Sequence, residues 1–291
     1  MLPYVVSADI YLLLAAWAQA KGFILPDDSF FLAFREKFVD QLIKIFSQVD
    51  LLAEMDLLFS LRTWLAGNRL PIVSLDRVYL PSLCAAYHPL ELTRAVGQAN
   101  QDLGLRPRAG APNLIQQLAS LSVSGQTEVA LVDDVIFSGD LLFKVITVLE
   151  RRGIRVGGIY AGVGIAEGLE KIARLNVPVS CAFVYDQVVD EVCERDFYPG
   201  VPLAGRLLVG SNNVGIPYIL PDGQPGRWAS IPEERQSSFS KFCWQQTSDL
   251  FSAIEECSGW PVLIRDLGRS ISSCPVPNAR FSRLIQEKTI F

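Results

Sequence analysis

The segment VALVDDVIFSGDLL, residues 129–142, places two aspartates and a serine–glycine turn between two apolar stretches. Its first part, Val129–Val132, is short, apolar and bounded by polar residues, which is typical of a strand buried on both faces. Beyond the turn, apolar residues recur at helical spacing as far as Glu150, and Gly153 is a typical helix stop. The segment therefore predicts a strand, a loop and a helix in that order.

A second apolar segment, Ile154–Ile165, follows the helix at once and has the composition of another strand. A strand, a helix and a strand joined this closely form a βαβ unit, and the two strands of such a unit are parallel. Ligands of open parallel sheets collect beyond the carboxyl ends of the strands, which is where Asp133 and Asp134 stand. We predict an α/β fold with a parallel sheet and a ligand site at these aspartates.

Residues 1–69 are predicted to form a helical N-terminal segment. Helical spacing covers Ser7–Lys21, with Ser7 as the N-cap and a glycine as the stop. A second helix is expected to begin at Pro26–Ser29, and a third to run from Asp50 to Ala66. Nothing in this segment carries chemistry, and its aromatic residues are interpreted as packing residues.

From Leu70 onward the sequence changes character. Leu70–Ser82 has the alternating, β-branched pattern of a strand, and Tyr87–Gly110 is a polar connection whose arginines either contact phosphate oxygens or face solvent. We expect an α/β core over residues 70–210. A C-terminal α/β extension or hood is expected over residues 211–291, with one helix from about Ser237 to Cys257.

The overall composition restricts the class of protein. Half of the 291 residues are apolar, which is enough for a sizeable core, and a formal charge of -5 with a pI near 5.1 gives no electrostatic footprint for duplex nucleic acid. The uncharged run Ile10–Ala20 is too short to cross a membrane, and no basic residue precedes it as in a signal peptide. We therefore expect a small-molecule ligand, with neither nucleic acid nor a membrane as partner.

The cysteines and the single histidine give no catalytic or metal motif. Six cysteines are scattered without a CxxC pair, which favours reduced thiols in a cytoplasmic protein over disulfides or a zinc site. His88 lies in AYHPL before a proline, where a loop histidine is favoured over a catalytic one. The cysteines are Cys84, Cys181, Cys193, Cys243, Cys257 and Cys274.

The turn at Ser138 and Gly139 suits a bound phosphate. Glycine permits a positive φ and a close approach of the backbone, and the helix that follows offers free N–H groups and the positive end of its dipole. The carboxylates of Asp133 and Asp134 cannot attract a phosphate by charge. They suit hydroxyl groups attached to the phosphate, or a magnesium ion, so a sugar phosphate fits this segment better than a phosphate alone.

These residues resemble the phosphoribosyl-pyrophosphate (PRPP) motif of type I phosphoribosyltransferases. The resemblance implies a parallel-sheet core, with Asp133 and Asp134 as catalytic residues that bind the ribose 2′ and 3′ hydroxyls. It also implies transfer of the phosphoribosyl group to or from an unidentified nitrogenous base, with magnesium and with pyrophosphate as leaving group. In such a reaction the protein mainly positions the reactants and stabilises the charge that develops. The 5′-phosphate would be bound by Phe137, Ser138, Gly139, Asp140 and Leu141.

In that family a hood over the sheet edge recognises the base, and the segment Cys193–Tyr198 resembles such a stretch. The resemblance implies that Asp196, together with Asp134, lies near magnesium, and that Phe197 stacks on the base. Arg77 and Arg195 are the further candidates for the pyrophosphate or base site.

The sequence departs from the family pattern at three positions. Asp140 and Leu141 stand where a small or basic residue and a threonine are common, so either Asp140 brings a negative charge to the phosphate or it only caps its helix. Phe137 stands where purine-using members often carry an acid. A non-catalytic PRPP or nucleotide sensor on the same fold is thus one alternative, and an acidic metal pocket like that of a response-regulator receiver is another. A homodimer also stays open.

Overall fold

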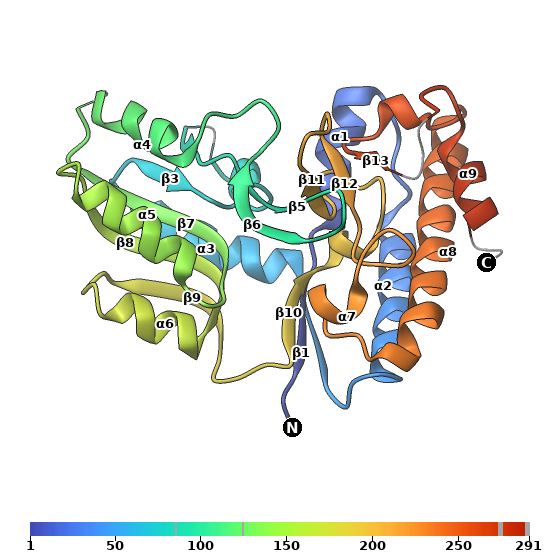
Figure 1. Cartoon of the computed structure of the whole chain (residues 1–291), viewed down its shortest axis with the longest axis horizontal. Helices are drawn as coiled ribbons and strands as arrows, with labels where there is room; N and C mark the ends of the chain where they lie inside the picture. Colours follow the sequence, from blue (N-terminus) through green and yellow to red (C-terminus); the bar gives the residue numbers. More distant parts are fainter. Residues whose placement is uncertain (85, 124, 273–275, 289–291) are drawn as a thin grey trace. The chain divides into compact units, whose positions relative to one another are not determined.

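The computed structural model describes residues 1–84, 86–123, 125–272 and 276–288 (Figure 1). The chain divides into two compact units. Unit 1 consists of Met1–Leu51, Arg94–Gly104 and Val189–Phe291, and unit 2 consists of Leu52–Thr93 and Leu105–Val188. This division differs from the expected segments 1–69, 70–210 and 211–291, because strand pairing joins segments that are far apart in the sequence.

Unit 2 contains a five-stranded sheet in the order β4-β3-β7-β8-β9, and every neighbouring pair is parallel. The predicted βαβ unit is confirmed, because β7, α5 and β8 follow one another and Val132 pairs with Tyr160 in parallel register. The strands are β3 (Ile72–Ser74), β4 (His88–Pro89), β7 (Glu128–Ile136), β8 (Arg155–Ile165) and β9 (Val179–Tyr185). The helices are α3 (Glu54–Gly67), α4 (Leu114–Val123), α5 (Asp140–Glu150) and α6 (Ala166–Ala173).

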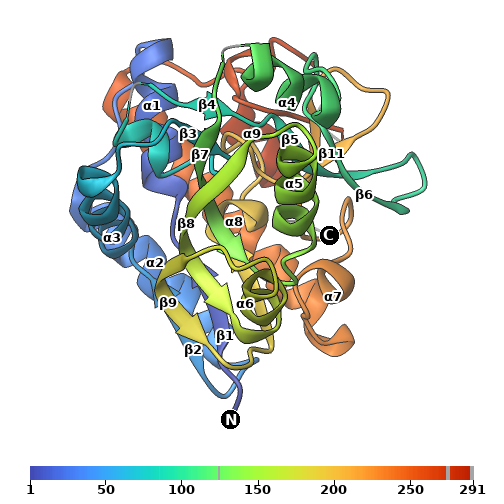
Figure 2. The same ribbon diagram turned by 90° about the vertical axis from the view of Figure 1, so that its left-hand side faces the viewer.

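The helices of unit 2 cover both faces of this sheet. Figure 2 shows α4, α5 and α6 on one face and α3 on the other. The amphipathic helix α5 buries Leu142, Val145, Ile146 and Leu149 in a core that includes β7 and β8 residues such as Leu131 and Ile159. The chain is thus an α/β protein with parallel strands, as predicted.

The strand order of this sheet reverses once. In chain order the strands β3, β4, β7, β8 and β9 lie as 2-1-3-4-5, so the chain first adds β4 on one side of β3 and then β7 on the other. At such a reversal the two connections leave in opposite directions, and a crevice opens at the carboxyl ends of the two central strands. In unit 2 these strands are β3 and β7.

Unit 1 contains two further sheets, in the orders β10-β1-β2 and β13-β12-β11-β5-β6. Their strands are β1 (Tyr4–Ser7), β2 (Val49–Leu52), β5 (Leu92–Val96), β6 (Asp102–Pro107), β10 (Asp190–Cys193), β11 (Arg206–Leu208), β12 (Val214–Ile216) and β13 (Ser270–Ile271), of which β2, β5 and β6 cross the unit boundaries. The helices are α1 (Ile10–Lys21), α2 (Asp28–Ile43), α7 (Pro225–Trp228), α8 (Glu233–Ser258) and α9 (Phe281–Lys288). The predicted C-terminal helix corresponds to α8.

The all-helical prediction for the first 69 residues is wrong. Tyr4–Ser7 forms the buried strand β1, which pairs in parallel with β10, so Ser7 lies in a strand and α1 begins at Ile10. Val49–Leu52 likewise forms β2 ahead of α3. The strand predicted over Leu70–Ser82 is also much shorter, because only Ile72–Ser74 pairs with its neighbours.

Two sequence expectations concern the thiols and the membrane. Cys84, Cys181, Cys193, Cys243 and Cys257 are free, whereas Cys274 lies outside the described residues. Within the described part of the chain, no helix combines the length and the apolar character that a membrane crossing requires.

Candidate functional site

Asp133 and Asp134 lie in the last part of β7, at the point where the strand loses its partner on one side. The pairing with β3 ends at Ser74 and Val132, whereas the pairing with β8 continues to Ile136. The N–H of Asp134 donates to Asp133 Oδ1 at 3.0 Å, and the N–H of Val135 donates to Asp134 Oδ1 at 2.9 Å. Each carboxyl group therefore accepts a local backbone hydrogen bond beside the end of β3.

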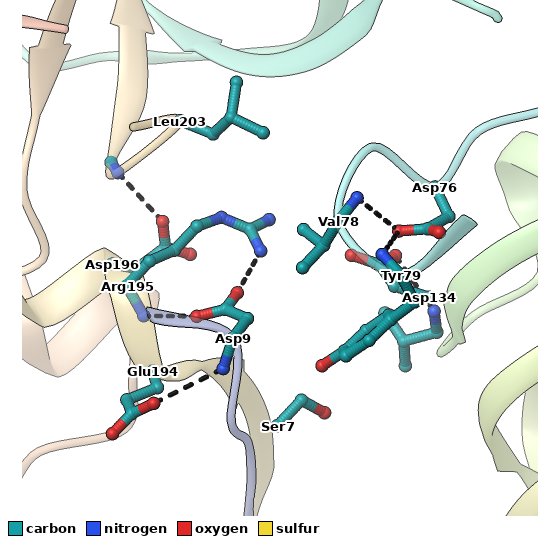
Figure 3. Close-up of polar contacts among 12 residues, drawn as sticks. Ser7, Asp9, Asp76, Val78, Tyr79, Asp134, Glu194, Arg195, Asp196 and Leu203 are labelled. Carbon is teal, nitrogen blue, oxygen red and sulfur yellow. Dashed lines mark hydrogen bonds and ion pairs between the residues drawn. The ribbon is translucent and has the colours of Figure 1, made fainter. Parts of the chain in front are cut away.

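A third carboxyl group, Asp76, follows β3 directly and was missed in the sequence analysis. Asp76 is fully buried and accepts N–H donors from Val78, Tyr79 and Leu80 at 2.7, 3.2 and 2.5 Å (Figure 3). An aspartate that binds the N–H groups following it is a recognised turn former, so the pattern LDRVY after a short strand is the signal that could have revealed it. The turn contains Arg77, whose guanidinium pairs with Glu91 at 2.9 Å.

The three carboxyl groups affect one another. Burial raises the pKa of Asp133 well above its ordinary value, and the charge and hydrogen bonding of Asp134 raise it further. Burial also raises the pKa of Asp76 to about 6, with a further contribution from the charge of Asp134, although the three N–H donors oppose the shift. The carboxyl group of Asp133 is therefore easier to protonate than an ordinary aspartate.

The loop after β7 begins the helix α5 through a left-handed glycine. Gly139 has φ +70° and is the N-cap of α5, and Asp140 is the first helical residue. The hydroxyl of Ser138 donates to Asp140 Oδ2 at 2.9 Å. Within the described residues, no hydrogen bond is present to the N–H groups of Gly139, Leu141 or Leu142, so the start of α5 offers the free donors that the sequence predicts.

The same loop contacts the first turn of α6. A Cβ on Gly139 would lie 2.9 Å from the carbonyl oxygen of Gly168, and a Cβ on Gly168 would lie 2.3 Å from the carbonyl oxygen of Phe137. One turn later on α6, Lys171 forms an ion pair with Asp140. The hydrogen bond from Lys171, followed by that from Ser138, lowers the pKa of Asp140. Asp140 is therefore not a side-chain N-cap but an ion-paired residue.

The predicted base-site residues belong to unit 1 and lie directly after β10. Asp196 accepts the N–H of Gly205 at 2.8 Å, and Arg195 pairs with Asp9, whose pKa burial raises to about 8 although Arg195 opposes the shift (Figure 3). Asp9 was not singled out in the sequence, because a single acid before a helix is an ordinary cap signal.

Phe197 is fully buried in unit 1. Its ring centroid lies 5.6 Å from that of Phe38, 5.1 Å from that of Phe239 and 6.4 Å from that of Tyr218. A nucleobase could stack on this ring only if these aromatic contacts opened. Base stacking by Phe197 stays a prediction.

The residues that were expected to bind magnesium belong to different units, Asp134 to unit 2 and Asp196 to unit 1. Among the described residues there is no group of three or more His, Cys, Asp or Glu side chains that could hold a metal. Magnesium in phosphate sites is commonly held by one or two carboxylates and by oxygens of the substrate. The half-buried Asp134 fits that minimal role, with most ligands supplied by the phosphorylated substrate.

No protein-family model matches this chain, and no curated protein matches it. Among solved structures, orotate phosphoribosyltransferase from Aeropyrum pernix is 21% identical, with a TM-score of 0.28 over 45% of this chain and 68% of that chain. The chain resembles type I phosphoribosyltransferases over about 45% of its length.

Two further phosphoribosyltransferases are similar over the same extent. The adenine phosphoribosyltransferase from Thermoanaerobacter pseudethanolicus is 13% identical, with a TM-score of 0.29 over 45% of this chain and 80% of that chain. The orotate phosphoribosyltransferase of Mycobacterium tuberculosis in complex with PRPP is 14% identical, with a TM-score of 0.27 over 44% of this chain and 70% of that chain. Similarity at this level assigns neither a ligand nor an activity.

Proposed function

We propose that unit 2 binds a phosphorylated pentose of the PRPP type at the carboxyl ends of β3 and β7. The observation that carries this proposal is the reversal of strand order between these strands, with Asp133, Asp134 and the free N–H groups of α5 at the same edge. Ligands of doubly wound sheets bind at this reversal. The predicted ribose and phosphate contacts thus lie on consecutive parts of one strand, loop and helix.

The chemistry of these groups suits both parts of such a ligand. The carboxyl oxygens of Asp133 and Asp134 can accept hydrogen bonds from vicinal hydroxyl groups. The free N–H groups of Gly139 and Leu141 lie at the start of α5, where the helix dipole favours a phosphate. Ser138 adds a hydroxyl beside them.

We further propose that the bound PRPP reacts as in phosphoribosyltransferases. A nitrogen of a base would form a bond to the anomeric carbon while the bond to pyrophosphate breaks, and pyrophosphate would leave with magnesium. The contribution of the chain is to hold the ribose through Asp133 and Asp134 and to fix its orientation. Arg77, Arg195, Asp196 and Phe197 stay predictions for the pyrophosphate and base.

A second candidate function is PRPP binding without transfer. It is favoured by the turn after β3, where the N–H groups of Val78, Tyr79 and Leu80 already bind Asp76 and the guanidinium of Arg77 already pairs with Glu91. A pyrophosphate group would have to compete with both interactions. The chain would then report the concentration of PRPP rather than consume it.

Calorimetry with PRPP and magnesium tests the common part of both functions. We expect binding by the wild-type chain and at least about a hundredfold loss of affinity in Asp133→Asn with Asp134→Asn, because the charge-assisted hydrogen bonds to ribose hydroxyls are each worth about 1.5–3 kcal/mol. Asp186→Asn, an exposed aspartate just after β9, is the control and should bind as the wild type does. An unchanged affinity in the double variant would remove the proposed site.

Release of pyrophosphate across a panel of nucleobases then separates the two functions. Release with one base identifies a transferase and its acceptor. Binding without release from any base supports the sensor function.

A further inference from the structure

The proposed phosphate loop receives no basic side chain from its own stretch of sequence. Residues 128–143, from the start of β7 to the first turn of α5, contain neither lysine nor arginine. A phosphate monoester carries about -1.5 to -2 charges at neutral pH. It would therefore meet the carboxyl groups of Asp133, Asp134 and Asp140 with only the backbone N–H groups and the hydroxyl of Ser138 as donors.

The packing of α6 on the loop supplies a cation from elsewhere in the chain. Gly139 and Gly168 are in such close contact that a Cβ on either would lie within 3 Å of a backbone oxygen of the other segment. This approach places Lys171, one helical turn beyond Gly168, at the start of α5. Its ammonium forms an ion pair with Asp140, which also accepts the hydroxyl hydrogen of Ser138.

The linked side chains of Ser138, Asp140 and Lys171 lie at the surface, with 71% of the Asp140 side chain and 37% of the Lys171 side chain exposed. Exposed ion pairs contribute little to stability by themselves. Here, however, the acid is the first residue of α5, beside the free N–H groups of Leu141 and Leu142, and it holds the ammonium at that place. An ammonium has three donors, so it can bind Asp140 and a phosphate oxygen at once.

We infer that Lys171 is a phosphate-binding residue of this site and that Asp140 is the residue that positions it. The inference rests on the proposed function, and it assigns a role to the acid that departs from the family pattern. Asp140 is paired before a ligand arrives, so the Asp140–Lys171 pair brings no net charge to the phosphate. Lys171 takes the place of the side-chain contact that is absent at Leu141.

The test measures binding of ribose 5-phosphate and of PRPP with magnesium by calorimetry. Lys171→Met keeps the aliphatic stem and removes the charge, and we expect it to weaken both ligands by at least about tenfold, as loss of a charge-assisted hydrogen bond does. Lys171→Arg keeps the charge and should retain affinity within about fivefold. Arg174→Met is the matched control, since it removes a cation from the exposed end of the same helix and should leave affinity unchanged.

The outcomes separate the two proposals. If the wild-type chain binds both ligands and Lys171→Met binds them as tightly as Arg174→Met does, the role of Lys171 is wrong and the site stands. If the wild-type chain binds neither ligand, the proposed function itself is wrong. Thermal melting of each variant, with Lys171→Gln as a second neutral substitution, shows whether a loss of affinity reflects a loss of folded protein.

Discussion

Asp76 and Asp134 interact electrostatically at the ends of β3 and β7, and this interaction adds to the burial that raises the pKa of Asp76. Asp76 is fully buried and binds three N–H groups of its own turn, whereas Asp134 is half-buried. A buried carboxylate beside other acids is costly for the folded state unless it binds a proton. The unfolding free energy of the chain should therefore depend measurably on pH through Asp76.

The pH dependence of stability should report Asp76. Its folded pKa is about 6, above the value of 3.8 expected in the unfolded chain, so its stabilising contribution is complete below about pH 4 and is lost as pH rises through 6. Asp76→Asn removes this dependence. We expect the difference in unfolding free energy between wild type and variant to change by about 3 kcal/mol over that range, measured by urea unfolding. Parallel curves for the two proteins would contradict the raised pKa.

The pair formed by Asp9 and Arg195 should show strong coupling. Asp9 is fully buried in unit 1, and Arg195 is its ion-pair partner. We expect Arg195→Met to lower the unfolding free energy by about 2–3 kcal/mol, because it leaves the carboxyl group without its charged donor. Asp9→Asn in the same chain should recover part of that loss. A double-mutant cycle in urea near pH 9, above the pKa of about 8 of Asp9, measures the coupling, and additive effects would exclude it.

Gly168 should tolerate no side chain. In Gly168→Ala the new Cβ would lie 2.3 Å from the carbonyl oxygen of Phe137, so either α6 or the loop must move. We expect a loss of about 1–3 kcal/mol and weaker binding of ribose 5-phosphate. Gly158→Ala is the control, because its Cβ would make only ordinary contact, 3.7 Å from the hydroxyl oxygen of Tyr160. Equal thermal stabilities of the two variants would contradict the close packing of loop and helix.

Phe197 should act as a core residue. Its ring is fully buried among other aromatic rings, so Phe197→Ala is expected to lower the unfolding free energy by about 3–5 kcal/mol. Phe59→Ala, which truncates a ring that is 72% exposed, should change it little. Denaturant unfolding compares the two. Similar small effects would instead leave Phe197 available for a base.

The sequence predicted the elements whose determinants are local. The strand β7, the turn at Gly139 and the helix α5 follow from apolar periodicity and one glycine, and the structure contains all three. The same reasoning missed β1, because Tyr4–Ser7 becomes a strand through pairing with remote segments, Asp190–Cys193 on one side and Val49–Leu52 on the other. No local pattern contains these partners.

The side chains of the candidate site likewise divide into those that a local sequence pattern identifies and those that only the fold brings to the site. Asp133 and Asp134 could be named because they follow an apolar run, and Gly139 because a turn needs it. Asp76 could not be associated with them, since their proximity depends on the pairing of β3 with β7. Lys171 is a similar case, because it reaches Asp140 only through the packing of α6 on the loop.

The discontinuous course of unit 1 has a consequence for biosynthesis. Tyr4–Ser7 is synthesised before unit 2 and can pair with Val49–Leu52, but its other partner, Asp190–Cys193, is synthesised only after all of unit 2. One edge of β1 therefore stays unpaired in the nascent chain until the inserted unit is complete. An unpaired strand edge is prone to pairing with other chains, so this chain order exposes the growing polypeptide to aggregation.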